Sequence, residues 1–163
     1  MEKKETVLNL LKDIKCILSQ TVLPYPMNRG SAEKDRFIKN SDGTVLDSST
    51  GLMWGSTLPK KLDWNNAVQA CKDLNFAGHK DWRLPTVKEL FSIVDHTKGA
   101  ENENNEPAID TALFSDTKCS WYWTSTPTAW SSGHAWFVDF DGGGVGSGDR
   151  GGSSYVRPVR SKK

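Results

Sequence analysis

The sequence predicts an α+β domain with a mainly antiparallel sheet. Short apolar runs separated by turn residues come first, two capped helical segments follow, and further strand-like pieces close the chain after a polar loop. Strands joined by tight turns pair antiparallel, whereas a parallel sheet needs strands that alternate with helices. The order of elements therefore favours two helices packed on an antiparallel sheet.

The opening strands are predicted between residues 36 and 54. Apolar runs in this segment are interrupted first by Asp42-Gly43 and then by the run from Ser48 to Gly51. An Asp-Gly pair between apolar runs is a strong hairpin signal, because glycine tolerates the backbone angles of a tight turn. We expect a pair of strands here.

Two helices are predicted from their N-caps. Asp63 precedes an amphipathic segment over residues 64–76, and Thr86 with Glu89 three positions later forms a capping box ahead of residues 87–94. Both patterns satisfy backbone N–H groups that the first helical turn leaves without partners. Strand-like pieces then follow around residues 121–126, 135–140 and 155–160.

The first 32 residues are expected to form an amphipathic helix over residues 2–20 and a linker, ahead of a folded domain over residues 33–163. Apolar residues recur at helical spacing in the helix, at Val7, Leu11, Ile14 and Leu18. Such a stripe either packs against its own domain or assembles copies of the chain through a short seam. Self-association through residues 2–20 is therefore one possibility.

The composition of the chain argues against nucleic-acid binding and against membrane insertion. The chain has 163 residues and a net charge of +1 from 21 basic and 20 acidic residues, so no basic footprint predicts nucleic-acid binding. No stretch reaches the roughly 18 apolar residues that span a bilayer, and no cleaved signal peptide is expected.

The cysteines and histidines suggest neither catalytic nor metal-ligating residues. Cys16, Cys71 and Cys119 are too widely spaced for a CxxC pair, and His79, His96 and His134 are dispersed. Either Cys71 and Cys119 form a disulfide or all three thiols stay reduced.

Five ordered motifs carry a family resemblance. They are DWRLPTVKEL (81–90), NEPAID (105–110), WYWTST (121–126), AWFVDF (135–140) and YVRPVR (155–160). With them, residues 36–160 strongly resemble the Lcl C-terminal-like domains. The resemblance implies a C-type-lectin-like fold related to that of formylglycine-generating enzymes.

Within that family the chain is similar to the variable proteins of diversity-generating retroelements, in which adenine-directed mutagenesis rewrites Asn codons in a C-terminal cassette. Such rewriting reaches Gly, Ser, Asp, His, Thr, Ala and Phe, but not Lys, Glu, Gln, Met or Trp. In the window from Phe137 to Ser154, 13 of 18 residues are Gly, Ser or Asp, and neither Asn nor any of the five unreachable types occurs. An ordinary Gly/Ser-rich loop is the alternative.

The resemblance places a ligand-binding surface in the variable region, about residues 128–154. The candidate variable positions are Thr128, Ser131, Ser132, Gly133, His134, Phe137, Asp139, Asp141, Gly142, Gly144, Gly146, Ser147, Gly148, Asp149, Gly151, Gly152, Ser153 and Ser154. The fixed scaffold residues are Trp82, Arg83, Trp121, Trp123, Trp136, Tyr155, Arg157 and Arg160.

Strand alternation suggests how the two sets are separated. If Trp136, Val138 and Phe140 point into the core, then Phe137, Asp139 and Asp141 project outward. The scaffold aromatics would supply buried area. The three scaffold arginines would order loop carbonyls or carboxylates, such as those of Asp81 or Asp110.

The expected partner is a protein or glycan of a cell surface, and the expected location of the chain is surface-displayed, virion-associated or extracellular. A non-diversified adhesin that binds glycans or glycosaminoglycans is the alternative, and an enzyme of the formylglycine-generating type is a third class. No cofactor is expected. Calcium is the weaker alternative, because NEPAID and residues 101–106 offer oxygen ligands while the EPN and WND triplets of calcium-dependent lectins are absent.

Overall fold

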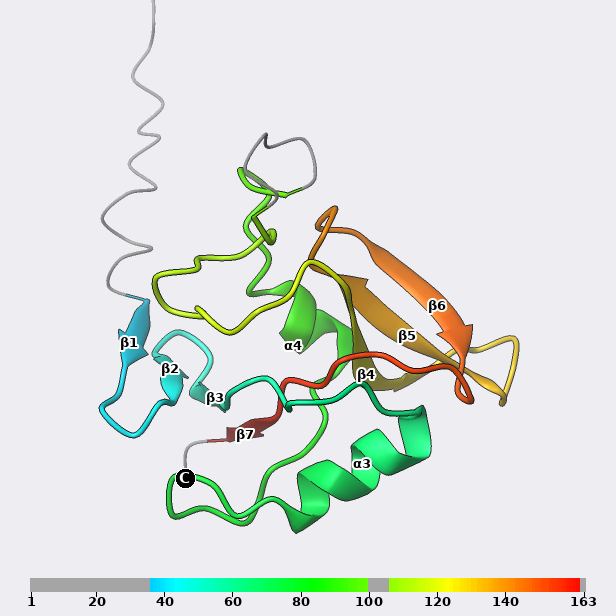
Figure 1. Ribbon diagram of the computed structural model, residues 1–163, viewed down its shortest axis with the longest axis horizontal. Helices are drawn as coiled ribbons and strands as arrows, with labels where there is room; N and C mark the ends of the chain where they lie inside the picture. The colour runs from blue at the N-terminus through cyan, green and yellow to red at the C-terminus, as the bar shows by residue number, and fades with distance from the viewer. Residues whose placement is uncertain (1–35, 100–105, 162–163) are drawn as a thin grey trace, which may run out of the picture. The chain divides into compact units, whose positions relative to one another are not determined.

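The computed structural model describes residues 36–99 and 106–161, which belong to a compact unit that begins at Arg36 (Figure 1). The helix predicted over residues 2–20 and its linker lie outside the described residues. The described part is a mixed α+β fold with two antiparallel sheets and two helices. The predicted α+β class is therefore confirmed, although the strands form two sheets instead of the expected single sheet.

The first sheet has the strand order β1-β2-β3-β7. Its strands are β1 (Phe37–Lys39), β2 (Val45–Asp47), β3 (Leu52–Trp54) and β7 (Val159–Ser161), and all neighbours are antiparallel. The opening segment thus holds three strands instead of the predicted pair. Gly43 and Gly51 turn the chain between them with φ of 86° and 68°, in the left-handed region that favours glycine.

The second sheet has the order β4-β5-β6, with β4 (Trp121–Pro127), β5 (His134–Asp139) and β6 (Val145–Asp149). No strand was predicted over the glycine-rich residues that form β6. They pair with β5 along their whole length. A backbone ladder needs no side chains, so an edge strand can form from residues of low strand propensity when a stable neighbour supplies hydrogen bonds.

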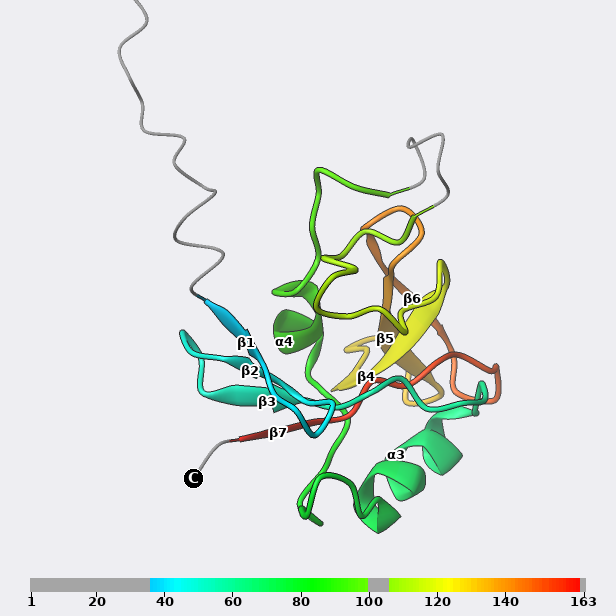
Figure 2. The ribbon, with the colours of Figure 1, turned by 60° about the vertical axis from the view of Figure 1, so that its left-hand side comes forward.

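The two helices are α3 (Trp64–Asp73) and α4 (Val87–Phe91). Both begin where predicted, since the Asp63 side chain accepts the N–H of Asn66 and the Thr86–Glu89 capping box is complete. Both end three residues earlier than predicted. In two views α4 lies between the two sheets, while α3 lies apart from β6 (Figures 1 and 2).

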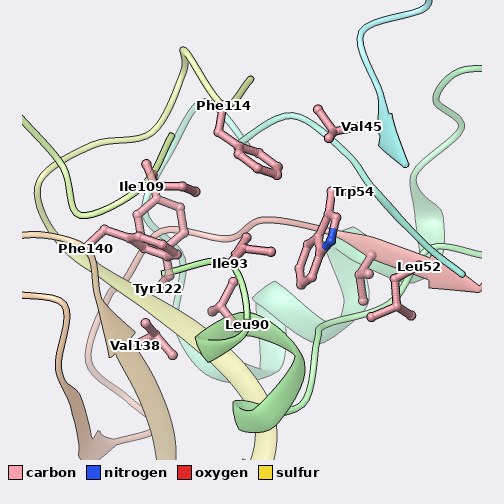
Figure 3. Packing of buried hydrophobic residues seen from close by; sticks show 11 residues of the cluster. Val45, Leu52, Trp54, Leu90, Ile93, Ile109, Phe114, Tyr122, Val138 and Phe140 are labelled. Atoms are coloured by element: carbon pink, nitrogen blue, oxygen red, sulfur yellow. The ribbon is translucent and has the colours of Figure 1, made fainter. Parts of the chain in front are cut away.

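The main core cluster draws residues from both sheets and from α4 (Figure 3). Trp54, Leu90, Tyr122 and Val138 are fully buried in it. A second cluster forms beside α3 and contains Ala67, Cys71, Leu84, Trp123, Ala135 and Val156. Burial of this apolar area is the main favourable term in folding.

A buried guanidinium joins segments that are distant in the sequence. The side chain of Arg157 is 2% exposed and donates to the carbonyl of Gly55 at 2.9 Å, to the hydroxyls of Thr57 and Thr117, and to Asp116 at 2.6 Å. Burial opposes ionisation of Asp116, but the charge of Arg157 and its hydrogen bond keep the pKa of that carboxyl below its usual value.

The other two scaffold arginines also bind carboxylates. Arg160 donates to both oxygens of Asp81, at 2.7 and 3.2 Å. Arg83 forms a two-pronged pair with Glu89, the capping-box residue of α4. Asp110, named as a possible partner, instead accepts the N–H of Ala112.

We predict that Arg157→Met lowers the free energy of unfolding by about 2–4 kcal/mol, because the buried carbonyl of Gly55 and the buried hydroxyl of Thr117 lose their donor. Arg83→Met is the matched control, since that ion pair is half exposed and should cost about 1 kcal/mol or less. Urea unfolding followed by tryptophan fluorescence measures both variants. Equal losses would contradict the central role of Arg157.

A second prediction concerns Asp47, whose buried carboxylate accepts two hydrogen bonds from Arg36. Burial alone would raise the pKa of Asp47, but the bonds from Arg36 and Ser49 lower it from 3.8 to about 2. The stability it supplies is therefore present above pH 3.8 and is lost as the pH falls toward 2.

Asp47→Asn should consequently flatten the dependence of the unfolding free energy on pH below about 4. Asp73→Asn, at an exposed position on α3, controls for the removal of one carboxylate. Urea titrations between pH 5 and pH 2 provide the measurement. An unchanged acid slope in Asp47→Asn would show that the Arg36–Asp47 pair is not linked to folding.

Candidate ligand-binding surface

The predicted variable positions lie along the β5–β6 hairpin and its flanking turns. The turn over residues 128–133 and the segment over residues 150–154 are neighbours, because Arg150 donates its N–H to the carbonyl of Gly133 at 2.8 Å. The turn over residues 140–144 joins β5 to β6 at the opposite end. The candidates therefore form two end groups connected by strand residues.

Two of the candidates do not reach the surface. Thr128 is 6% exposed and its hydroxyl donates to the carbonyl of Ser131. Ser154 is 3% exposed and exchanges backbone hydrogen bonds with Leu62. Each lies where the variable segment rejoins the core, which explains the burial. The other candidates are partly or fully exposed.

The predicted alternation along β5 is only partly correct. Val138 and Phe140 are buried as expected, but Trp136 is half-buried and packs edge-to-face on the exposed Trp130. Phe137, expected to project outward, packs against the cluster beside α3, to which Ala135 belongs. Both faces of β5 are covered over part of their length, so alternation does not separate inside from outside there.

An aromatic stack occupies the face of the second sheet that carries Phe137. The Phe137 ring lies parallel to Trp121, with centroids 4.9 Å apart and 12° between planes, and meets Trp123 edge-on. Trp123 is buried, and its indole N–H donates to the carbonyl of Leu62. Trp121 is 53% exposed, so the expectation that it is a buried scaffold residue is wrong.

Two glycines of β6 make room for the Phe137 ring. A Cβ atom at Gly146, the cross-strand partner of Phe137, would lie 2.7 Å from ring carbons. One at Gly148 would lie 3.3 Å away. Contacts this short force a side chain to move. The residues at positions 137 and 146 are therefore sterically coupled.

The remaining scaffold aromatics have structural contacts. Trp82 is buried and its indole N–H donates to the carbonyl of Phe76. Tyr155 is half-buried, tilts against Tyr122, and lies under the ammonium group of Lys61.

Sequence reasoning missed Trp64. Its indole N–H donates to the carbonyl of Thr124. The guanidinium carbon of Arg150 lies over its ring, 4.1 Å from the ring centroid. The only available signal was a tryptophan at the first position of a predicted helix. This contact holds the one basic residue of the variable region against the scaffold.

Acidic residues lie close to the aromatic stack. Asp139 is the cross-strand partner of Trp121 and accepts the N–H of Asp141. Burial raises the pKa of the nearby Cys119 thiol, and the negative charge of Asp141 adds a smaller effect in the same direction. The carboxylates of Asp139 and Asp141 therefore act electrostatically on this end of the hairpin.

Cys71 is fully buried and forms no disulfide with Cys119, so of the two alternatives the thiols of these two cysteines stay reduced. Burial raises the pKa of the Cys71 thiol to about 12. In the described ranges, no group of three or more His, Cys, Asp or Glu side chains is arranged to hold a metal ion. Within those same ranges, no helix is long and apolar enough to cross a membrane.

The fold and the displayed hairpin define a small α+β scaffold with a surface-exposed β-ribbon. Residues 43–160 match the family model of the Lcl C-terminal domain, and the chain belongs to that family. A search of curated proteins found no match.

We predict that Gly146→Ala destabilises the protein by about 1–3 kcal/mol through overpacking against Phe137. In a Phe137→Ala background the same change should be neutral or stabilising, because the ring is gone and alanine restricts the unfolded chain. Gly144→Ala is the matched control, since nothing lies within 4 Å of its Cβ position.

A double-mutant cycle measured by urea unfolding isolates the coupling between positions 137 and 146. Additive effects of the two substitutions would contradict the steric coupling. A loss in Gly144→Ala as large as that in Gly146→Ala would assign the effect to glycine removal in general.

Proposed function

We propose that this chain is a ligand-binding protein with a C-type-lectin-like scaffold, and that its variable region is the product of a diversity-generating retroelement. One observation carries the proposal. The residue types reachable from Asn codons are concentrated on the exposed hairpin, whereas the motif residues Trp123, Val156 and Arg157 are buried in the frame.

The placement of β6 supports this division. Its side chains contribute no member to either core cluster, and Val145, its one large apolar residue, is 42% exposed. Substitutions on β6 and in the adjoining turns therefore leave most of the packed interior unchanged. A binding surface that changes without loss of the fold requires this separation.

The charge of the hairpin weighs against the alternative, an adhesin for polyanionic glycosaminoglycans. Asp139, Asp141 and Asp149 are at least partly exposed, while Arg150 packs on Trp64. A polyanion site needs a basic patch. An adhesin for neutral glycans remains the second candidate.

The third candidate, an enzyme of the formylglycine-generating type, depends on reactive cysteines. A thiolate is the nucleophile in such chemistry, and a pKa near 12 keeps Cys71 protonated. We therefore propose a binding function that needs no cofactor, for a protein or glycan partner of a cell surface. Display on a surface or virion, or secretion, fits that partner.

The nucleotide sequence around the gene tests diversification directly. We expect an Asn-rich near-copy of codons 128–154 that differs from them only at adenines, together with a reverse transcriptase gene. Differences spread over all four bases, or no near-copy, would contradict the proposal. Light scattering with and without residues 1–32 tests the further expectation that residues 2–20 mediate self-association.

Tolerance to substitution gives an independent prediction. Asparagine placed singly at the exposed positions Ser132, Gly144 and Ser153 should change the free energy of unfolding by no more than about 0.5 kcal/mol. At the buried Thr128 and Ser154 it should cost about 1–3 kcal/mol. Urea unfolding measures all five variants. Uniform losses would contradict a surface built for variation.

A further inference from the structure

We propose that the exposed face of Trp121, beside Asp139 and Asp141, binds a cationic group, the guanidinium or ammonium of an Arg or Lys side chain on a protein ligand. The inference rests on the proposed binding function and specifies its ligand class. It follows from the exposure of the ring, the charges around it, and the stack that holds it.

The ring has one covered face and one open face. Phe137 lies parallel to Trp121 at 4.9 Å, yet the Trp121 side chain remains 53% exposed. Because Phe137 covers one face, the exposed area lies on the rest of the residue, which includes the opposite face. Tryptophan is the aromatic side chain that attracts a cation most strongly, because the quadrupole of its ring gives the face a negative electrostatic potential.

Local charge selects a cation over other ligands. Asp139 is paired with Trp121 across β4 and β5, and cross-strand Cβ atoms lie about 5 Å apart. Asp141 follows two residues later and donates its N–H to Asp139. A carboxylate beside an aromatic face adds direct Coulomb attraction for a cation and repels an anion.

The nearest basic residue of the variable region does not neutralise these carboxylates. Arg150 follows β6 at the far end of the hairpin, and its guanidinium lies over Trp64 at 4.1 Å. In the strand register, Asp149 pairs with His134 at the Arg150 end of the hairpin. Asp139 pairs with Trp121 at the other end. The acidic groups at the Trp121 end are thus displayed without that cation.

The stack also holds the ring in place before a ligand arrives. Phe137 packs between Trp121 and the edge of Trp123, and Gly146 leaves space for it on β6. A preordered aromatic anchor loses little conformational entropy on binding. Trp121 belongs to a fixed motif, while positions 139 and 141 are candidate variable positions. The same ring could therefore meet differently charged ligands in other variants.

The test is a titration of the full chain with three peptides, acetyl-GRGRG-amide, acetyl-GQGQG-amide and acetyl-GEGEG-amide, followed by NMR of the tryptophan indole N–H signals. We expect only the arginine peptide to shift the Trp121 signal. Its affinity should fall about tenfold in Trp121→Ala and Trp121→Leu, the latter retaining apolar area without a π-face. Asp139→Asn should also weaken binding and reduce its dependence on salt.

Trp130→Ala is the matched control, because Trp130 is 66% exposed but packs on Trp136 instead of the stack. It should leave the affinity unchanged. Equal weakening in Trp130→Ala, retention of binding in Trp121→Ala, or no binding of the arginine peptide would each overturn the inference. Binding of maltohexaose or a heparin fragment at Trp121 in its place would overturn it in favour of a glycan.

These outcomes are separate from those of the proposed function. The genomic test of diversification does not depend on ligand charge, so it can succeed while the peptide titration fails. Circular dichroism of each variant confirms that a loss of binding is not a loss of fold.

Discussion

The buried guanidinium of Arg157 is the interaction on which the frame depends. It binds the carbonyl that follows β3, two threonine hydroxyls and the carboxylate of Asp116, and so connects the C-terminal motif to both earlier segments. The neighbouring residues Val156 and Val159 each enter a different core cluster. An arginine suits this position because its planar fork donates several hydrogen bonds in fixed directions. The proposed variable region ends at residue 154, three residues before this anchor, so the frame holds its C-terminal end in place.

The hairpin is fixed at both ends and along one edge, but it is not uniformly free to vary. Phe137 occupies the space above Gly146 and Gly148, so a larger residue at position 146 requires a smaller one at position 137. Thr128 and Ser154 are buried where the segment meets the core. Substitution on this scaffold is therefore limited by packing at a few positions and is less restricted in the exposed turns. If the region is diversified as proposed, fewer surfaces are usable than the accessible codons alone would give.

Much of the fold could be predicted from local signals. The Asp-Gly turn, the Asp63 cap and the Thr86–Glu89 capping box each report a hydrogen-bonding need within a few residues, and each element begins where that need is met. The features that were not predicted depend on contacts between segments that are distant in the sequence. The strand β6 depends on pairing with β5, and the two covered faces of β5 depend on where α3 and α4 pack. No pattern inside residues 134–149 records either neighbour, so periodicity alone overestimated the burial of Trp136 and underestimated that of Phe137.

Trp121 illustrates why exposure matters more than residue type at a candidate site. As part of an aromatic motif it was expected to be buried, since a large apolar ring normally gains by leaving water. Instead, Phe137 stacks on one face, and Trp121 as a whole remains 53% exposed. The exposed part of the indole gains no burial in the free protein, so covering it with a partner would be favourable. In the proposed function, Trp121 would offer the same contact in every variant, while the candidate variable positions Asp139 and Asp141 would select the charge of the ligand.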